Sequence, residues 1–152
     1  MSRRDQIRMT DAEIDEFLSG RHTMNVASFN HDGTIHLVAM WYAVLDGDPV
    51  FWTFGKSQKI KNLQRDPRTT LLVEAGEEYG ELIGVELVGR ATVLTERDEI
   101  MEIGEAVYAR YFGEVTDEVR PFVELTGAKR FGVRVTVDRV VSWDHKKLDG
   151  AY

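Results

Sequence analysis

Hydrophobic residues recur along this chain at two spacings, and the spacing separates predicted strands from predicted helices. Over residues 130–143, apolar and polar side chains alternate, as they do in a strand with one buried face. Over residues 95–113, apolar side chains return every three or four positions, as they do in a helix with one buried face. Strand-like runs bounded by turn residues predict six strands, at residues 22–29, 34–45, 50–54, 68–75, 81–94 and 130–143.

Turn and capping residues mark where several of these elements begin and end. Thr10-Asp11-Ala12-Glu13 is a capping box that starts a first helix, and Gly20 ends that helix. Asp32-Gly33 supplies a hairpin turn between the first two strands. A short helix is predicted over residues 57–64, directly after the third strand, and Asp66-Pro67 ends it.

The six strands are predicted to be antiparallel and to close into a small barrel. Most consecutive strands are joined by tight turns or by one short helix, and such connections suit antiparallel neighbours. Gly84 and Gly89 lie inside the fifth strand, where they indicate bulges or bends in a curved sheet. Because closure removes exposed edges, we expect a mainly β fold, a six-stranded antiparallel barrel with ancillary helices. Residues 119–127 are predicted to be less regular.

Length and composition predict one domain that spans residues 1–152. The chain has 152 residues and 43% hydrophobic content, enough for one core, with a polar arm at residues 1–9 and a polar tail at residues 144–152. It contains no cysteine, which excludes disulfides, thiolate metal sites and cysteine nucleophiles. It has neither a signal-peptide pattern nor an apolar run of membrane-spanning length. We therefore expect a cytoplasmic protein without a membrane partner.

The start of the predicted short helix is strongly basic. Residues 56–68 carry five basic side chains and one acidic side chain, a local net charge of plus four in a chain whose net charge is −7. A helix start also has unpaired N–H groups and the positive end of the helix dipole, which favour an anion. A basic island in an acidic chain indicates one localised anionic ligand, whereas nucleic acid needs a broad positive surface. We therefore expect a phosphate site here and no nucleic-acid partner.

No side chain stands out as a catalytic acid, base or nucleophile. His22, His31, His36 and His145 match no closed zinc pattern, so no metal site is expected. The serines lack the flanking residues of a nucleophile elbow, and Glu77-Glu78 is best interpreted as a solvated charge cluster. A protein that binds a redox cofactor needs no such residue, because the cofactor carries its own reactive centre and needs the protein mainly for position and electrostatics.

Motifs in a fixed order resemble those of the pyridoxamine-phosphate-oxidase-like split β-barrel family. They are Val50-Phe51-Trp52-Thr53, then Ser57-Gln58-Lys59, then Asp66-Pro67, and Trp143 fits the tryptophan that ends the closing strand of that family. The resemblance covers most of the chain, residues 10–148, and implies the FMN-binding split-barrel fold. The Ser-Gln-Lys motif and the run from Asn62 to Arg68 most resemble the branch that uses the deazaflavin coenzyme F420 rather than FMN.

The resemblance also implies which residues bind the cofactor. The ring contacts would be Val38, Ala39, Met40 and Trp41, mostly through backbone groups, with Trp52 and Thr53 along the other edge of the ring. The phosphate contacts would be Ser57, Gln58 and Lys59, and Lys61 is a further candidate although it lies on a different helix face from Lys59. Ser57 has an alternative role as a helix N-cap, and the tryptophans have an alternative role in core or dimer packing. The family forms homodimers with cofactors near the subunit interface, so Trp143 would belong to its own site or to the partner's.

Three functions are compatible with these residues. The first is an F420-dependent oxidoreductase that transfers hydride to a small organic acceptor, such as an enone, a quinone or a tetrapyrrole-like compound. The second is an FMN-dependent enzyme on the same fold, and the third is a non-catalytic protein that binds flavin or deazaflavin without turnover. The basic side chains of Lys56, Lys61, Arg65 and Arg68 favour the first, because F420 carries an oligoglutamate tail that FMN lacks. Pyridoxal phosphate synthesis is not expected, since Asp144-His145-Lys146-Lys147 lacks the arginine-containing substrate signature of the family oxidase.

Overall fold

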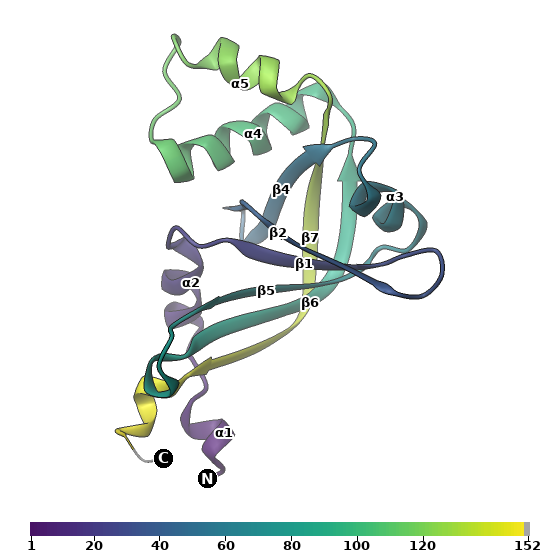
Figure 1. Cartoon of the computed structure of the whole chain (residues 1–152). Helices are drawn as coiled ribbons and strands as arrows, with labels where there is room; N and C mark the ends of the chain where they lie inside the picture. Colours follow the sequence, from purple (N-terminus) through teal and green to yellow (C-terminus); the bar gives the residue numbers. More distant parts are fainter. Residues whose placement is uncertain (151–152) are drawn as a thin grey trace.

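One antiparallel sheet of seven strands forms the body of the molecule (Figure 1). The computed structural model describes residues 1–150, so the last two residues of the predicted polar tail, 151–152, lie outside the described residues. The strands pair in the order β2-β1-β5-β6-β7-β4-β3. Their bounds are Met24–Phe29 for β1, Ile35–Met40 for β2, Ala43–Leu45 for β3, Asp48–Phe54 for β4, Arg68–Ala75 for β5, Ile83–Leu94 for β6 and Arg130–Asp144 for β7.

The predicted count of six strands is wrong because the strand expected at residues 34–45 is two strands. The chain leaves β2 at Trp41 and Tyr42 and re-enters the sheet as β3, so β2 lies at one edge of the sheet and β3 at the other. The backbone N–H of Tyr42 donates to the Tyr111 hydroxyl (3.3 Å) instead of to a neighbouring strand. Within residues 1–150 no strand pairing joins β2 to β3, so the predicted closure of the barrel by hydrogen bonds is also wrong.

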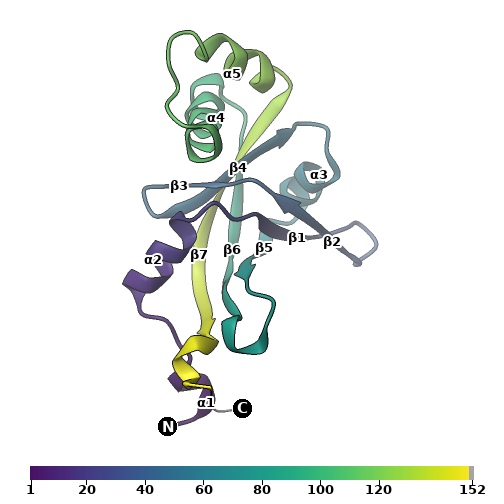
Figure 2. The same cartoon turned by 60° about the vertical axis from the view of Figure 1, so that its left-hand side comes forward.

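Helices lie at both ends of the sheet, and α2 and α3 lie beside it between those ends (Figures 1 and 2). Helices α4 and α5 lie together at one end, and α1 lies at the other end beside the N-terminus. The helix bounds are Arg3–Gln6 for α1, Asp11–Ser19 for α2, Gln58–Arg65 for α3, Tyr79–Glu81 for η1, Arg97–Phe112 for α4, Arg120–Gly127 for α5 and His145–Leu148 for η2. The prediction of a less regular segment at residues 119–127 is wrong, because most of that segment is α5.

The predicted capping box and one of the predicted bend glycines are confirmed. The Thr10 hydroxyl accepts from the backbone N–H of Glu13, and the Glu13 carboxylate accepts from the backbone N–H of Thr10. The pairing of β6 with β7 shifts register between Val88 and Gly89. A side chain at Gly89 would overlap the backbone of β7, so only glycine allows this approach.

Two apolar clusters hold α3 and α4 in place. Ile60 and Leu63 of α3 are buried in the main core with residues of β1, β4, β5, β6 and β7, so the helix is fixed against the sheet. Ile103 and Val107 of α4 belong to a second cluster, which packs on β3 and β4. The end of β4 therefore lies between two helical segments. The first turn of α3 is on one side of it and the α4–α5 pair is on the other.

Candidate functional site

The first turn of α3 lacks the groups that normally satisfy a helix start. Ser57 is the N-cap, but its side chain makes no capping hydrogen bond, and the turn contains no acidic residue. In contrast, α1 and α2 both have complete capping boxes. The Ser57 Oγ atom is buried and has no hydrogen-bond partner among residues 1–150. A helix start with free amides and an unsatisfied hydroxyl is suited to bind an anion.

Lys59 supplies a cation at this helix start. Its Nζ donates to the Thr53 hydroxyl (3.2 Å), and no carboxylate within residues 1–150 forms an ion pair with it. Burial lowers the pKa of Lys59, and the positive charge of Arg130 lowers it further. Thr53, a predicted ring contact, is itself buried, with 4% of its surface exposed, and its hydroxyl holds the lysine in place. An anionic ligand would relieve the unbalanced charge.

A buried amide below α3 fixes the orientation of its first turn. Asn62 is fully buried, and its Nδ2 donates to Ser28 Oγ (3.1 Å) and to Asn30 Oδ1 (2.9 Å). Its Oδ1 accepts from Gln58 Nε2 (2.8 Å) and from Arg65 Nη2 (3.1 Å). Gln58 therefore lies along the helix, with one of the two N–H donors of its side-chain amide occupied. The spacing of Gln58 and Asn62, four residues apart on a helix, is the signal that could have identified this pair from the sequence.

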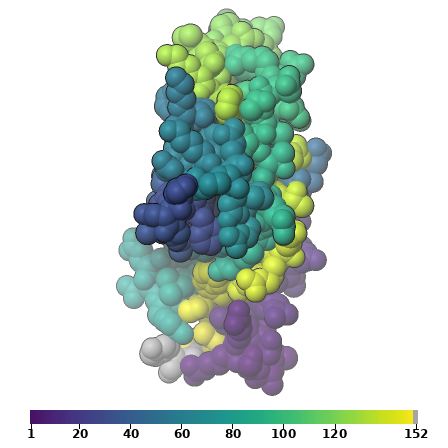
Figure 3. All heavy atoms as spheres, turned by 90° about the vertical axis from the view of Figure 1, so that its right-hand side faces the viewer, coloured from purple at the N-terminus to yellow at the C-terminus, as the bar shows by residue number. Residues whose placement is uncertain are grey.

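The basic island is smaller in space than in sequence. Arg68 forms a salt bridge with Asp66 (2.6 Å), and Arg65 donates to the Phe29 carbonyl (2.6 Å) as well as to Asn62. Lys56 and Lys61 are exposed and have no partner among residues 1–150. Figure 3 shows the face on which α3 is exposed, between the α4–α5 end and the β1–β2 hairpin.

A pocket with aromatic walls lies on the other side of β4, under α4 and α5. It has a volume of about 320 Å³, within the range of small-ligand sites. Its lining includes Met40, Trp41, Trp52, Phe112, Phe122 and Arg130. Three predicted site residues, Met40, Trp41 and Trp52, are therefore brought together here.

Arg130 joins the pocket to the helix start, and sequence analysis missed it. Its guanidinium lies over the rings of Phe54 (4.8 Å) and Trp52 (5.2 Å), and its Nε donates to the Thr126 carbonyl (3.1 Å). Burial lowers the pKa of this guanidinium. The pairing of Arg130 with Phe54 across β7 and β4 places it close to Lys59. Hydrophobic patterns do not give the register between strands so far apart in sequence, so no signal in the chain identified this residue.

Trp52 serves packing as well as the pocket. A side chain at Gly104 or Gly127 would overlap the Trp52 ring. The Trp52 indole therefore packs directly against the backbone of α4 and α5 at these two glycines. Trp41 is 46% exposed and stacks on Tyr111 with ring centres 4.4 Å apart. Both observations fit the packing role that the sequence left open, while each ring also lines the pocket.

The predicted ring-binding segment lies at a free edge of the sheet. Val38 and Met40 pack against the main core, whereas Ala39 is exposed. Because β2 pairs only with β1, part of its backbone N–H and C=O groups face away from any strand. These groups are available for backbone contacts with a ligand.

Trp143 is not near the other predicted residues within one chain. It pairs with Gly84 at one end of β7, whereas Arg130 begins the same 15-residue strand at the other end. At about 3.3 Å per residue the two positions are roughly 40 Å apart along the strand. Within one chain, Trp143 therefore lies away from this site.

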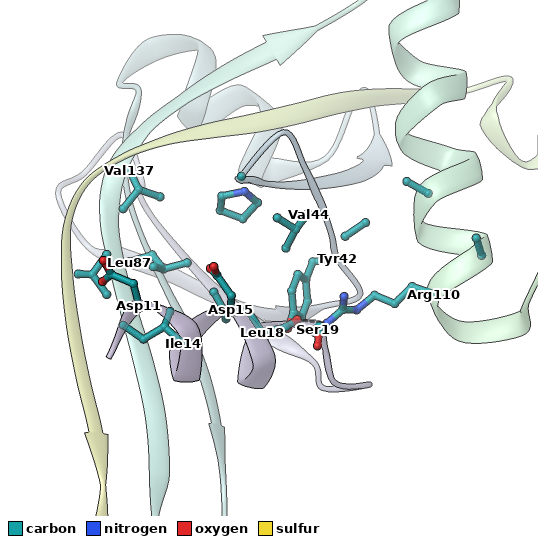
Figure 4. Close-up of a pocket in the computed structure, with 16 residues that line it drawn as sticks. Asp11, Ile14, Asp15, Leu18, Ser19, Tyr42, Val44, Leu87, Arg110 and Val137 are labelled. Atoms are coloured by element: carbon teal, nitrogen blue, oxygen red, sulfur yellow. Dashed lines mark hydrogen bonds between the residues drawn. The ribbon is translucent and has the colours of Figure 1, made fainter. Parts of the chain in front are cut away.

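The molecule also contains a larger cavity, which holds none of the predicted residues (Figure 4). It has a volume of about 690 Å³ and lies between α2, β3, α4 and the β6–β7 pair. Its two most buried polar groups are committed to the fold: Arg110 donates to the Leu18 and Gly20 carbonyls, and the Tyr42 hydroxyl donates to the Leu18 carbonyl (2.7 Å).

Residues 1–150 contain no group of three or more histidine, aspartate or glutamate side chains placed to hold a metal ion. No helix in the same range combines the length and apolar character needed to cross a bilayer.

Comparison with known proteins identifies the fold and the family. A crystal structure of the conserved hypothetical protein Rv2991 from Mycobacterium tuberculosis is 43% identical, with a TM-score of 0.93, and the match covers 98% of this chain and 93% of that one. A protein from Bacteroides thetaiotaomicron named for 5-nitroimidazole antibiotic resistance is 13% identical over 90% of this chain and 84% of that one, with a TM-score of 0.75.

A structure named F420 reductase is 21% identical over 83% of this chain and 94% of that one, with a TM-score of 0.65. No curated protein matches. The family model described as pyridoxamine 5'-phosphate oxidase matches residues 10–144. The chain therefore belongs to the pyridoxamine 5'-phosphate oxidase family of flavin-binding proteins.

Proposed function

We propose that this protein is a homodimeric oxidoreductase that binds reduced F420 and transfers hydride to a small organic acceptor. The observation that carries the proposal is the open start of α3. There the buried Ser57 hydroxyl has no partner among residues 1–150, and Lys59 has no counter-ion in the same range. Because buried polar groups are normally satisfied, this pairing of a free donor and a free cation favours a phosphate ligand.

The remaining predicted contacts fit one orientation of the coenzyme. With the phosphate at Ser57 and Lys59, the ring lies against the free edge of β2 at Val38, Ala39, Met40 and Trp41. The α3 amides and Lys59 bind the phosphate, while Gln58, held by Asn62, keeps the first turn in place. When bound, the reduced deazaflavin supplies the hydride, so the protein needs no nucleophile of its own.

The choice of F420 over FMN rests on two exposed lysines. The charge of Arg68 is balanced by Asp66, and Arg65 keeps its charge but is held by the Phe29 carbonyl, so the attraction for an oligoglutamate tail comes mainly from Lys56 and Lys61. The fold is shared with a structure named F420 reductase, at 21% identity. An FMN-dependent enzyme and a carrier without turnover remain the alternatives, since Ser57 and Lys59 would hold the phosphate of either cofactor. We place the protein in the cytoplasm, whose reducing conditions suit a chain without cysteine.

The outer face of β2 and the position of Trp143 support the proposed homodimer. Ile35 and Leu37 are 65% and 66% exposed, and Ala39 on the same face is also exposed. A row of exposed apolar side chains on an edge strand is typical of a protein interface. In such a dimer the partner copy would supply Trp143 to the site.

Calorimetry tests the cofactor assignment. We expect F420 to bind more tightly than FMN, and the difference to shrink as the ionic strength rises, because the extra affinity comes from exposed charges. Lys56→Gln with Lys61→Gln should remove most of the difference. Equal or tighter binding of FMN would contradict the F420 assignment while leaving the phosphate site intact. Reoxidation of bound F420H₂ by a panel of acceptors would separate an enzyme from a carrier.

A further inference from the structure

We propose that the aromatic pocket under α4 and α5 binds the electron acceptor, and that this acceptor is a planar one- or two-ring compound carrying a carboxylate. The carboxylate pairs with the guanidinium of Arg130. The role as acceptor rests on the proposed function, whereas the binding of such a compound does not.

The size of the pocket limits the ligand. Its volume of about 320 Å³ equals that of about ten water molecules at roughly 30 Å³ each. One or two fused six-membered rings with a small substituent fit this space. A tetrapyrrole, with four rings, would extend beyond the pocket, so the smaller acceptors fit it better.

The walls of the pocket select a flat, apolar ligand. Trp41 and Trp52 line the pocket together with Phe112 of α4 and Phe122 of α5, and the Trp41 and Phe112 rings meet edge-on with their centres 5.4 Å apart. Phe112 and Phe122 are 62% and 61% exposed, so these rings are available to a ligand. Aromatic side chains pair with flat rings in stacked or edge-on geometry, which gives affinity without fixing a substituent pattern.

Arg130 gives the pocket its preference for an anion. Its Nε is occupied by Thr126, but neither terminal nitrogen has an acceptor among residues 1–150. No carboxylate in that range forms a salt bridge with it, and the nearby Lys59 carries a charge of the same sign. A half-buried guanidinium without a counter-ion favours an anion, and its planar pair of donors matches a carboxylate.

The position of the pocket suits transfer from the coenzyme. Met40, the last residue of β2, and Trp41, which follows it, are both predicted ring contacts and both line the pocket. A ligand in the pocket therefore lies next to the ring. The acceptor takes the hydride at an unsaturated carbon or a quinone oxygen and one proton from water, so it gains two electrons while the reduced deazaflavin is oxidised.

Two unreactive probes of the same shape test the binding. We would titrate the full-length protein with 2-naphthoate and with 2-naphthamide, following tryptophan fluorescence and calorimetry, in the absence of coenzyme. We expect 2-naphthoate to bind at least tenfold more tightly than 2-naphthamide. Arg130→Gln should abolish this preference, while the control Lys129→Gln, at the exposed neighbouring position, should retain it.

A second variant keeps the proposal testable if Arg130→Gln does not fold. Phe122→Ala changes an exposed ring, so it should fold normally, and it should weaken both probes several-fold while leaving the preference for 2-naphthoate. Equal affinity for the two probes, no binding of either, or an unchanged preference in Arg130→Gln would overturn the inference. Binding of 2-naphthoate that depends on Arg130 in a protein that does not bind F420 would refute the proposed function alone. Binding of F420 without binding of 2-naphthoate would refute this inference alone.

Discussion

The two residues that carry the cofactor site, Ser57 and Lys59, differ in what they do without a ligand. The Ser57 hydroxyl makes no hydrogen bond within residues 1–150, whereas Lys59 is held by Thr53. Truncating Ser57 or Lys59 should therefore change the free energy of unfolding and the affinity for the coenzyme by different amounts. This difference separates a ligand-binding role from a purely structural one.

Lys59→Ala should lower coenzyme affinity by about 1.5–3 kcal/mol, or roughly ten- to 150-fold, the usual scale for a hydrogen bond to a charged group. The fold should remain intact, because removing a half-buried cation without a counter-ion deletes no ion pair. Calorimetric titration measures the change. Lys129→Ala is the control and should leave the coenzyme affinity unchanged, since Lys129 is an exposed lysine outside the predicted cofactor contacts. An unchanged dissociation constant in Lys59→Ala would reassign this lysine to the surface.

Ser57→Ala should weaken coenzyme binding by about 1 kcal/mol while leaving the free energy of unfolding nearly unchanged. A serine that acted only as an N-cap would show the opposite result, a loss of about 1 kcal/mol in stability and no change in affinity. Urea unfolding and ligand titration of the same variant distinguish the two. A stability loss without an affinity loss would remove Ser57 from the site.

At the scale of elements, the break between β2 and β3 decides where the site lies. Tyr42 turns into the protein at this break, and its hydroxyl donates to the last turn of α2 through the Leu18 carbonyl. Arg110 of α4 lies over the Tyr42 ring, 4.2 Å from its centre. Tyr42 thus ties α2 and α4 to the point where the chain crosses from one edge of the sheet to the other.

The buried Tyr42 hydroxyl should make the free energy of unfolding decrease at alkaline pH. Burial raises the pKa of Tyr42 from 10.0 to about 12. A raised pKa means that the folded state retains a proton that the unfolded state loses, so the contribution is complete below pH 10 and is lost as the pH rises toward 12. Tyr42→Phe should cost about 1 kcal/mol at neutral pH and show a smaller decline above pH 10. Urea unfolding at several pH values measures both, and equal declines in the two proteins would contradict the assignment.

Local sequence signals predicted some elements well and others poorly. The capping box at Thr10, the short helix after β4 and the bulge at Gly89 depend on residues close in sequence, and all three are confirmed. The break at Tyr42 was missed because both halves are apolar, and what separates them is a contact with Tyr111, 69 residues away. Arg130 was missed for the same reason, because its position depends on the register between β4 and β7, which are far apart in the sequence.

At the scale of the whole molecule, the family and the mainly β fold could be predicted, but the shape of the sheet could not. The order of motifs from Trp52 to Trp143 identified the family, and the family model confirms it over residues 10–144. The predicted six-stranded closed barrel was wrong in two respects. The sheet has seven strands, and its two edge strands, β2 and β3, are consecutive in the chain but form no hydrogen-bonded pair. The site assignment remains a prediction that rests on the open helix start and on the pocket beside it.

The exposed face of β2 leads to a prediction about assembly. In a dimer built on this face, Leu37→Lys would place a charge in the interface, so the variant should sediment as a monomer while the parent protein sediments as a dimer. Analytical ultracentrifugation measures this, and Lys146→Gln, at an exposed polar position, is the control. Because Trp143 would come from the partner, the monomeric variant should also bind the coenzyme more weakly. A parent protein that sediments as a monomer would refute the proposed dimer.

A crystal structure of the protein with F420 tests the central claim most directly. The account predicts the phosphate at the start of α3, within hydrogen-bond distance of Ser57 Oγ and Lys59 Nζ, and the ring against the free edge of β2. A coenzyme bound elsewhere, or a helix start still unoccupied at saturating F420, would contradict it.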